Sequence, residues 1–190
     1  MMIETRTCRS AWAHMTEISD RQPVRNYVQI LDMSDYLVET DLFPEAALIA
    51  YSDLNMEKNI SDEQKQYISE LRGGAQGNYS EGMARKIANV IDCLTSYPQS
   101  KRAVITMCNQ PAPDHRNDAD AKCLRELQLY LDDEGRLSGT AFFRAQAAQI
   151  FPKNIHFIGS IMTEVAGRLP QKPALGTLFY LATILVSDRA

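Results

Sequence analysis

The chain has 190 residues, of which 45% are hydrophobic and 23% are charged, and its formal net charge is −4. A chain of this size and composition predicts one domain, residues 1–190, with a single well-buried core. The weak negative charge argues against bulk binding of nucleic acid, which needs a positive surface.

The apolar runs and the cysteines indicate in which cellular compartment the protein is found. No run approaches the roughly 20 apolar residues of a membrane span, and the N-terminal residues lack the apolar core of a signal peptide. The four cysteines are far apart and form no CxxC pair: Cys8, Cys93, Cys108 and Cys123. This spacing disfavours zinc and predicts free thiols in a reducing cytoplasm.

The first third of the chain mixes helix and strand signals. Apolar spacing predicts a short helix over Ser10–Ile18, and apolar and β-branched residues predict a strand over Tyr27–Met33. The apolar run Pro44–Asp53 fits a helix or a buried strand. Ser61-Asp-Glu-Gln64 is a capping box, which predicts a helix to about Leu71.

The middle third begins with a glycine-rich stretch, Arg72–Asn78. It lacks the Gly-Lys-Ser/Thr ending of a phosphate-binding P-loop, and we interpret it as a flexible connection. The clearest helix is predicted over Glu81–Leu94, ended by Pro98. A buried strand is predicted over Arg102–Met107, and a polar loop over Pro111–Asp120.

The last third favours strands. Cys123–Leu131 and Arg136–Phe143 are predicted to form a hairpin through an Asp-Glu-Gly turn. An amphipathic helix is predicted over Ile155–Val165 and a last strand over Leu178–Val186. Mixed helices and strands with a sheet-rich C-terminal half indicate an α+β fold.

Three ordered stretches between Tyr79 and Asn154 carry a family pattern. They are Tyr79-Ser-Glu-Gly82 with its helix and Pro98-Gln-Ser-Lys-Arg102, then Cys123 with Leu-Gln-Leu-Tyr130 and Gly-Arg-Leu-Ser138, then Phe143-Arg144 with Pro152-Lys-Asn154-Ile. Their order and spacing resemble thymidylate synthase and the related pyrimidine nucleotide hydroxymethylases. The resemblance implies a mixed sheet flanked by helices and a homodimer packed sheet against sheet.

The same resemblance implies a reaction. The Cys123 thiolate would add to C6 of a pyrimidine nucleoside monophosphate, and C5 would then take a one-carbon unit, methyl or hydroxymethyl, from 5,10-methylenetetrahydrofolate. Arg144 would favour the thiolate and bind the nucleotide phosphate. Lys101 and Arg102 would reach the partner subunit's phosphate, and Asn154 would hydrogen-bond the pyrimidine edge.

Each of these residues also has an ordinary structural explanation. A lone cysteine beside a strand is usually an inert core residue, and Arg144 could pair with Glu126 or Asp133. Lys101 and Arg102 could be a solvated pair, and Asn154 could cap a helix beginning at Ile155.

The chain departs from the family pattern around the site. Apolar or different residues stand where the family has proline, histidine, serine, aspartate and a ribose-binding set: Lys122, Leu124, Ala145, Ala147, Ala182, Ile184 and Val186. Because each lost hydrogen bond costs about 0.5–1.5 kcal/mol, binding of ordinary deoxyuridylate should be weaker.

Three hypotheses follow. The first, which we favour, is a divergent one-carbon transferase that uses Cys123. The second is a non-catalytic nucleotide-binding or structural protein on a degenerate synthase scaffold, with Ile184 and Val186 filling the ribose position. The third is an unrelated α+β protein, in which Cys123 and Arg144 lie on opposite faces.

Overall fold

The computed structural model describes residues 3–69, 72, 77–117 and 120–188. Its elements are β1 (Thr5–Thr7), α1 (Cys8–Ser19), β2 (Val24–Asp32), α2 (Glu45–Asn55), α3 (Asp62–Lys65), α4 (Met83–Ser96), β3 (Val104–Thr106), β4 (Leu124–Leu131), β5 (Leu137–Phe143), β6 (Gln146–Ala147), the 3₁₀ turn η3 (Ala148–Ile150), α5 (Phe151–Arg168) and β7 (Leu175–Val186). The fold is α+β, with a seven-stranded mixed sheet flanked by helices, as predicted at that level.

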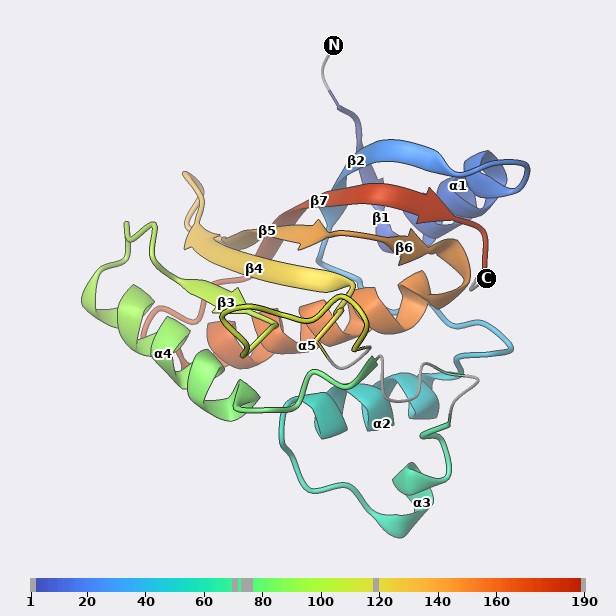
Figure 1. Cartoon of the computed structure of the whole chain (residues 1–190). Helices are drawn as coiled ribbons and strands as arrows, with labels where there is room; N and C mark the ends of the chain where they lie inside the picture. The colour runs from blue at the N-terminus through green and yellow to red at the C-terminus, as the bar shows by residue number, and fades with distance from the viewer. Residues whose placement is uncertain (1–2, 70–71, 73–76, 118–119, 189–190) are drawn as a thin grey trace.

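The last strand lies in the middle of the sheet. The strand order is β1-β2-β7-β5-β4-β3, and β6 also pairs with β7. β7 runs antiparallel to β2 and parallel to β5, while β4 and β5 form the predicted antiparallel hairpin (Figure 1). The C-terminal part of the chain therefore returns beside the strand pair that carries Cys123 and Arg144.

Helix α1 confirms the helix predicted near the N-terminus, and the ambiguous run after Pro44 is the helix α2. The capping box is present, because the Ser61 hydroxyl accepts from the Gln64 N–H and the Gln64 side chain accepts from the Ser61 N–H. The predicted length of this helix is wrong, since α3 ends at Lys65 and buries no residue. Short helices are stable mainly through tertiary packing, and α3 has no buried face that would support further turns. Leu71 itself lies outside the described residues.

Three other predicted elements are confirmed, with slightly different first and last residues. Helix α4 and strands β3 and β7 lie where the sequence places them, to within three residues at each end. The glycine-rich connection predicted over Arg72–Asn78 lies mostly outside the described residues.

Helix α5 is longer than predicted, and it is amphipathic as predicted. It runs from Phe151 to Arg168 and lies between the sheet on one side and α2 and α4 on the other (Figure 1). Its first two turns are buried all round, whereas from Ser160 on it leaves Thr163, Gly167 and Arg168 at the surface. The predicted start at Ile155 is therefore wrong, and Asn154 stands inside the first turn.

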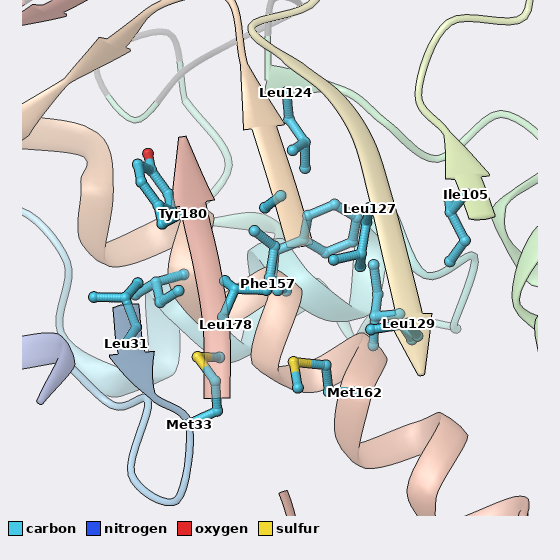
Figure 2. Packing of buried hydrophobic residues seen from close by; sticks show 14 of the residues in the cluster. Leu31, Met33, Ile105, Leu124, Leu127, Leu129, Phe157, Met162, Leu178 and Tyr180 are labelled. Carbon is cyan, nitrogen blue, oxygen red and sulfur yellow. The ribbon is translucent and has the colours of Figure 1, made fainter. Parts of the chain in front are cut away.

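The main core fills the space between the sheet and α5. Leu127 and Leu129 of β4, Leu178 of β7 and Phe157 and Met162 of α5 are fully buried and meet there (Figure 2). Strand residues alternate between the two faces of a sheet, so every second residue of β4 and β7 enters this core. The packing fixes how the ends of the strands sit over the first turn of α5.

The opposite face of the sheet, here called the open face, is also apolar. It carries Val28, Ile30, Phe142, Phe179 and Leu181, which are partly exposed and lie opposite one another across β2, β7 and β5. Phe179 is 36% exposed. Figure 1 shows α5, α2 and α4 gathered on the other side of the sheet. None of the helices in the described ranges has the length and apolarity needed to cross a membrane.

Candidate functional site

Cys123 and Arg144 lie side by side at one end of the β4–β5 hairpin. The Arg144 N–H donates to the Cys123 carbonyl at 2.9 Å, next to the paired residues Leu124 and Phe143. A register shift between Leu124 and Glu126 interrupts the ladder there, and such bulges re-aim side chains near sites. The two residues are therefore backbone neighbours across the hairpin.

A cavity of about 210 Å³ adjoins the Cys123 side chain. Its walls come from several segments: Gly77, Tyr79, Cys123, Ala145, Gln146, Ala147, Ile150, Lys153, Asn154, Val186 and Asp188. Cys123 is a free, partly buried thiol. The predicted nucleophile thus faces open space, and predicted Asn154 shares the same cavity with it.

Tyr79 forms the wall beside the thiol. Its hydroxyl accepts from the Leu124 N–H at 3.1 Å, and its ring stacks on Phe157 at 5.7 Å between centroids. Burial raises the pKa of Tyr79 far above its ordinary value, so the phenol stays neutral at physiological pH. Tyr79 belongs to the tyrosine-glycine element of the sequence pattern, and the structure places it against Cys123.

Asn154 belongs to a buried polar network. Its Nδ2 donates to Gln146 Oε1 at 2.9 Å, and the Tyr180 hydroxyl donates to the same oxygen at 2.6 Å. The side chain of Gln146 completes the set by donating from Nε2 to the Ala147 carbonyl. The residue that precedes α5 as its N-cap is Ile150, so the helix-cap explanation of Asn154 is wrong.

The Arg144 guanidinium lies against the backbone just before the thiol. Nε donates to the carbonyls of Ala121 and Lys122 at 3.2 Å, and Nη2 donates to Ala121. Within the described ranges it forms no ion pair, so the predicted alternatives Glu126 and Asp133 are not its partners. The side chain is exposed and is not part of the cavity wall, although its charge lowers the pKa of Tyr79 slightly.

Lys122 brings a second cation to the thiol. It is only 8% exposed, and its ammonium lies over the Tyr79 ring at 5.6 Å. Burial lowers the pKa of Lys122, and the groups that oppose this include Cys108 and Cys123. Sequence reasoning treated Lys122 only as a departure from the family pattern. The structure adds it as a charged neighbour of the nucleophile.

A second cavity adjoins the first. It measures about 270 Å³ and lies between α2 and the chain around Tyr67, with walls that include Tyr51, Ser69 and Gly77. Gly77 borders both cavities, and a Cβ there would come within 2.7 Å of Lys153 Nζ. The buried Lys153 lies over the Tyr51 ring at 4.7 Å. The two cavities thus share Gly77 as a wall residue, and Cys123 lines the first of them.

The end of β7 supplies the remaining wall. Val186 lines the cavity at one position of the family's ribose-binding set, whereas Ile184 does not line it. Asp188 adds a carboxylate to the cavity wall. The spacing of residues in the sequence does not predict where Val186 and Asp188 lie, because their positions follow from the parallel pairing of β6 with β7.

Lys101 and Arg102 lie at the other end of β4. Both side chains are exposed, and the Lys101 carbonyl accepts from Gln128 at 3.0 Å. At roughly 3.3 Å per residue, the strand from Leu124 to Tyr130 separates them from Cys123 by about 20 Å. Within one chain the structure does not bring these two residues to the cavity.

The other candidate ligands and thiols stay apart. Burial raises the pKa of Cys8 to about 12, as expected of an inert core thiol. Cys93 and Cys108 are partly exposed free thiols. In the part of the chain that the structure describes, no group of three or more His, Cys, Asp or Glu could hold a metal ion.

Comparison with protein-family models gives no match, and comparison with curated proteins gives none either.

Proposed function

We propose that the protein is a divergent member of the thymidylate synthase family that transfers a one-carbon unit to C5 of a pyrimidine nucleoside monophosphate. One observation carries the proposal. Cys123 and Asn154, which the resemblance implies as nucleophile and ring-binding residue, wall the same cavity, together with Tyr79. The family's fold agrees with the mixed sheet and its flanking helices.

The chemistry begins at the Cys123 sulfur. The thiolate, and not the thiol, is the nucleophile. Lys122 precedes Cys123 in the chain, and Arg144 lies across the hairpin from it. Addition of the thiolate to C6 makes C5 nucleophilic, and later elimination of the thiolate regenerates the enzyme. Asn154 holds the edge of the ring during these steps.

The nucleotide phosphate needs cations beyond the cavity wall. Arg144 is exposed beside the thiol, and its partners are neutral carbonyls. A guanidinium suits phosphate because its donors form a planar fork. We assign Arg144 to this subunit's phosphate, and Lys101 and Arg102 to that of the partner subunit.

The partner subunit would pack on the open face. When one face of a sheet is in contact with water, the residues on that face are normally polar. Here Ile30, Phe142 and Phe179 lie on it and remain partly exposed. Contiguous exposed apolar area of this kind marks a contact surface. Packing of two such faces gives the sheet-against-sheet homodimer. Free thiols at all four cysteines agree with a cytoplasmic location.

The second cavity fits the one-carbon donor, 5,10-methylenetetrahydrofolate. Tyr51 and Tyr67 offer aromatic surface to a flat ring, and the Ser69 hydroxyl is buried without a partner among the described residues. The cavity meets the thiol cavity at Gly77. The donor would supply the one-carbon unit, while these residues would hold its ring beside the bound nucleotide.

Release of the C5 hydrogen tests the reaction. Deoxyuridine monophosphate labelled with tritium at C5 should release tritium to water in the presence of the folate donor. Cys123→Ala should abolish release, because Cys123 is the one thiol among the described residues of the cavity wall. Cys108→Ala is the matched control and should retain turnover. Normal release by the Cys123→Ala variant would reject the proposal.

Mixing two inactive variants tests the shared phosphate site. If Arg102 serves the partner's nucleotide, Cys123→Ala mixed with Arg102→Ala gives heterodimers with one intact site. Random assortment should then restore about a quarter of the wild-type activity. No recovery of activity after subunit exchange would place Arg102 outside the site.

A charge on the open face tests the proposed dimer interface. Phe179→Asp should give monomers when the molecular mass is measured by light scattering.

A non-catalytic nucleotide-binding protein is the second candidate. Val186 favours it, because an apolar side chain stands in the cavity wall at a position of the ribose-binding set. This candidate predicts a rise in Tm with pyrimidine monophosphates, no tritium release, and no effect of folate. Turnover that depends on Cys123 would exclude it.

A further inference from the structure

The hydrogen bonds that link Asn154, Gln146 and Ala147 have only one possible assignment of donors and acceptors. The Ala147 carbonyl can only accept a hydrogen bond, so the Gln146 atom that faces it must be the Nε2 donor. The other end of the Gln146 amide is then Oε1, which accepts from Tyr180 and from Asn154. The Asn154 atom that meets it must be Nδ2. One backbone carbonyl therefore determines the orientation of two side-chain amides.

The surroundings hold the network in place. Gln146 is 1% exposed, Asn154 is 4% exposed and Tyr180 is fully buried. The Tyr180 ring is fixed by Phe143, with which it stacks at 4.8 Å, and by Phe151 at 5.6 Å. Burial raises the pKa of Tyr180 well above its ordinary value, so its hydroxyl remains a donor at physiological pH. Rotating the Gln146 amide would set Oε1 against the Ala147 carbonyl and Nε2 against Asn154 Nδ2, and so would lose both of these bonds.

Asn154 has hydrogen-bonding capacity left for a ligand. Its bond to Gln146 is the one side-chain bond it makes within the described residues, and it lines the cavity beside Cys123. Oδ1 and the second Nδ2–H are therefore available. An amide that can rotate presents either atom at a given place. It could then accept a hydrogen bond from the N3–H of uracil or donate one to N3 of cytosine equally well.

We propose that Gln146 is a positioning residue that prevents rotation of the Asn154 amide and so makes the cavity selective between uracil and cytosine edges. Gln146 does this without reacting with the ring. The ligand part of this inference rests on the proposed pyrimidine site, whereas the locked amide rests on the hydrogen bonds alone.

Binding of two nucleotides to three proteins tests the selectivity. By calorimetry, the wild type should bind deoxyuridine monophosphate at least about tenfold more tightly than deoxycytidine monophosphate, since a mispaired polar edge forfeits a hydrogen bond. Gln146→Leu should reduce this ratio to about one. Tyr180→Phe removes a bond from the same oxygen but leaves Asn154 held by Gln146, so it should retain the preference.

A second variant guards against loss of folding. Gln146→Glu has the same shape, and a buried carboxyl that faces a carbonyl takes the protonated form. The protonated group donates to the Ala147 carbonyl and still accepts from Asn154, so this variant should retain the preference when Gln146→Leu loses it. An unchanged ratio in Gln146→Leu would overturn the inference. So would an equal loss in Gln146→Leu and Tyr180→Phe, which would indicate a merely structural role.

A measurement without ligand separates this inference from the proposed function. In ¹⁵N-labelled protein, the Asn154 side-chain amide is identified by its loss in Asn154→Asp. Its hydrogen exchange should be at least about tenfold faster in Gln146→Leu than in the wild type or Tyr180→Phe. If neither nucleotide binds the wild type, the proposed function fails while this exchange still decides the role of Gln146. Equal exchange in all three proteins would refute that role.

Discussion

The two ends of the β4–β5 hairpin use an arginine in opposite ways. At the turn, Arg136 forms ion pairs with Asp132 at 3.0 Å and Glu134 at 3.1 Å. At the cavity end, Arg144 donates to backbone carbonyls, and no carboxylate among the described residues pairs with it. The charge of Arg136 is neutralised within the turn, whereas the charge of Arg144 has no carboxylate partner among the described residues.

The same contrast applies to the polar groups around the two arginines. The Asp132 carboxylate accepts from the N–H groups of Glu134 and Arg136, from Arg136 Nε and from the Ser138 hydroxyl. That cluster stabilises the turn. At the cavity end, Cys123 and Asn154 face open space. If the cavity end binds the proposed nucleotide, changes at the two ends of the hairpin should affect different measurements.

The largest expected effect is on ligand binding at the cavity end. Arg144→Ala should weaken binding of deoxyuridine monophosphate about 10- to 100-fold, because hydrogen bonds to a charged group contribute about 1.5–3 kcal/mol. Since the side chain is exposed, the free energy of unfolding should change by less than about 1 kcal/mol. Calorimetry measures the first quantity and urea denaturation the second.

The matched control is Arg136→Ala at the turn. It removes the same charge from the same pair of strands, yet nucleotide affinity should remain within about twofold, because Arg136 already has carboxylate partners. Equal weakening by both variants would mean that net charge, rather than the position of Arg144, controls binding.

The next effect is on stability at the turn. Asp132→Ala should lower the free energy of unfolding by about 2 kcal/mol, since four donors lose a charged acceptor at a partly exposed site. Nucleotide affinity should not change. The adjacent Asp133→Ala should cost less than about 0.5 kcal/mol. A similar loss in both variants in urea denaturation would contradict the role assigned to Asp132.

Acid should remove part of this stabilisation. Burial of the Asp132 carboxyl raises its pKa, but hydrogen bonds from Arg136 and Ser138 outweigh burial and lower the pKa below its ordinary value. A lowered pKa in the folded state adds stability above the unfolded pKa of about 3.9, and this is lost as the pH falls through the folded pKa. The stability gap between wild type and Asp132→Asn should therefore be constant above about pH 5 and shrink below pH 4. A gap that is independent of pH would be the contrary result.

The sequence predicts the hairpin well because its determinants are local. Alternation of Leu127, Leu129 and Leu131 predicts β4, and Gly135 marks the turn, where it adopts a positive φ of 74°. The capping box at Ser61 is local too and is present. These features depend on neighbours within a few residues, so spacing is enough to predict them.

The site is less predictable because its partners are distant in sequence. The placement of Asn154 depends on Gln146 and on Tyr180 of β7, and the cap interpretation of Asn154 failed because η3 starts the helix earlier. Nothing in the spacing marks Gln146, which follows Arg144 among alanines. Asp188 reaches the cavity only because β7 lies beside β5 and β6.

The smallest expected effect tests the turn itself. Gly135 has φ of 74°, and a Cβ at this position would meet nothing within 4 Å, so a substitution should cost only backbone strain. Gly135→Ala should lower the free energy of unfolding by about 1 kcal/mol, and Gly135→Asn by less, because asparagine visits the left-handed region more readily. Gly167→Ala in α5 is the control with opposite sign, since its Cβ is equally unobstructed in a helical backbone and should stabilise by about 0.5 kcal/mol. Destabilisation by both alanine variants would show that packing, and not backbone conformation, governs the turn end of the hairpin.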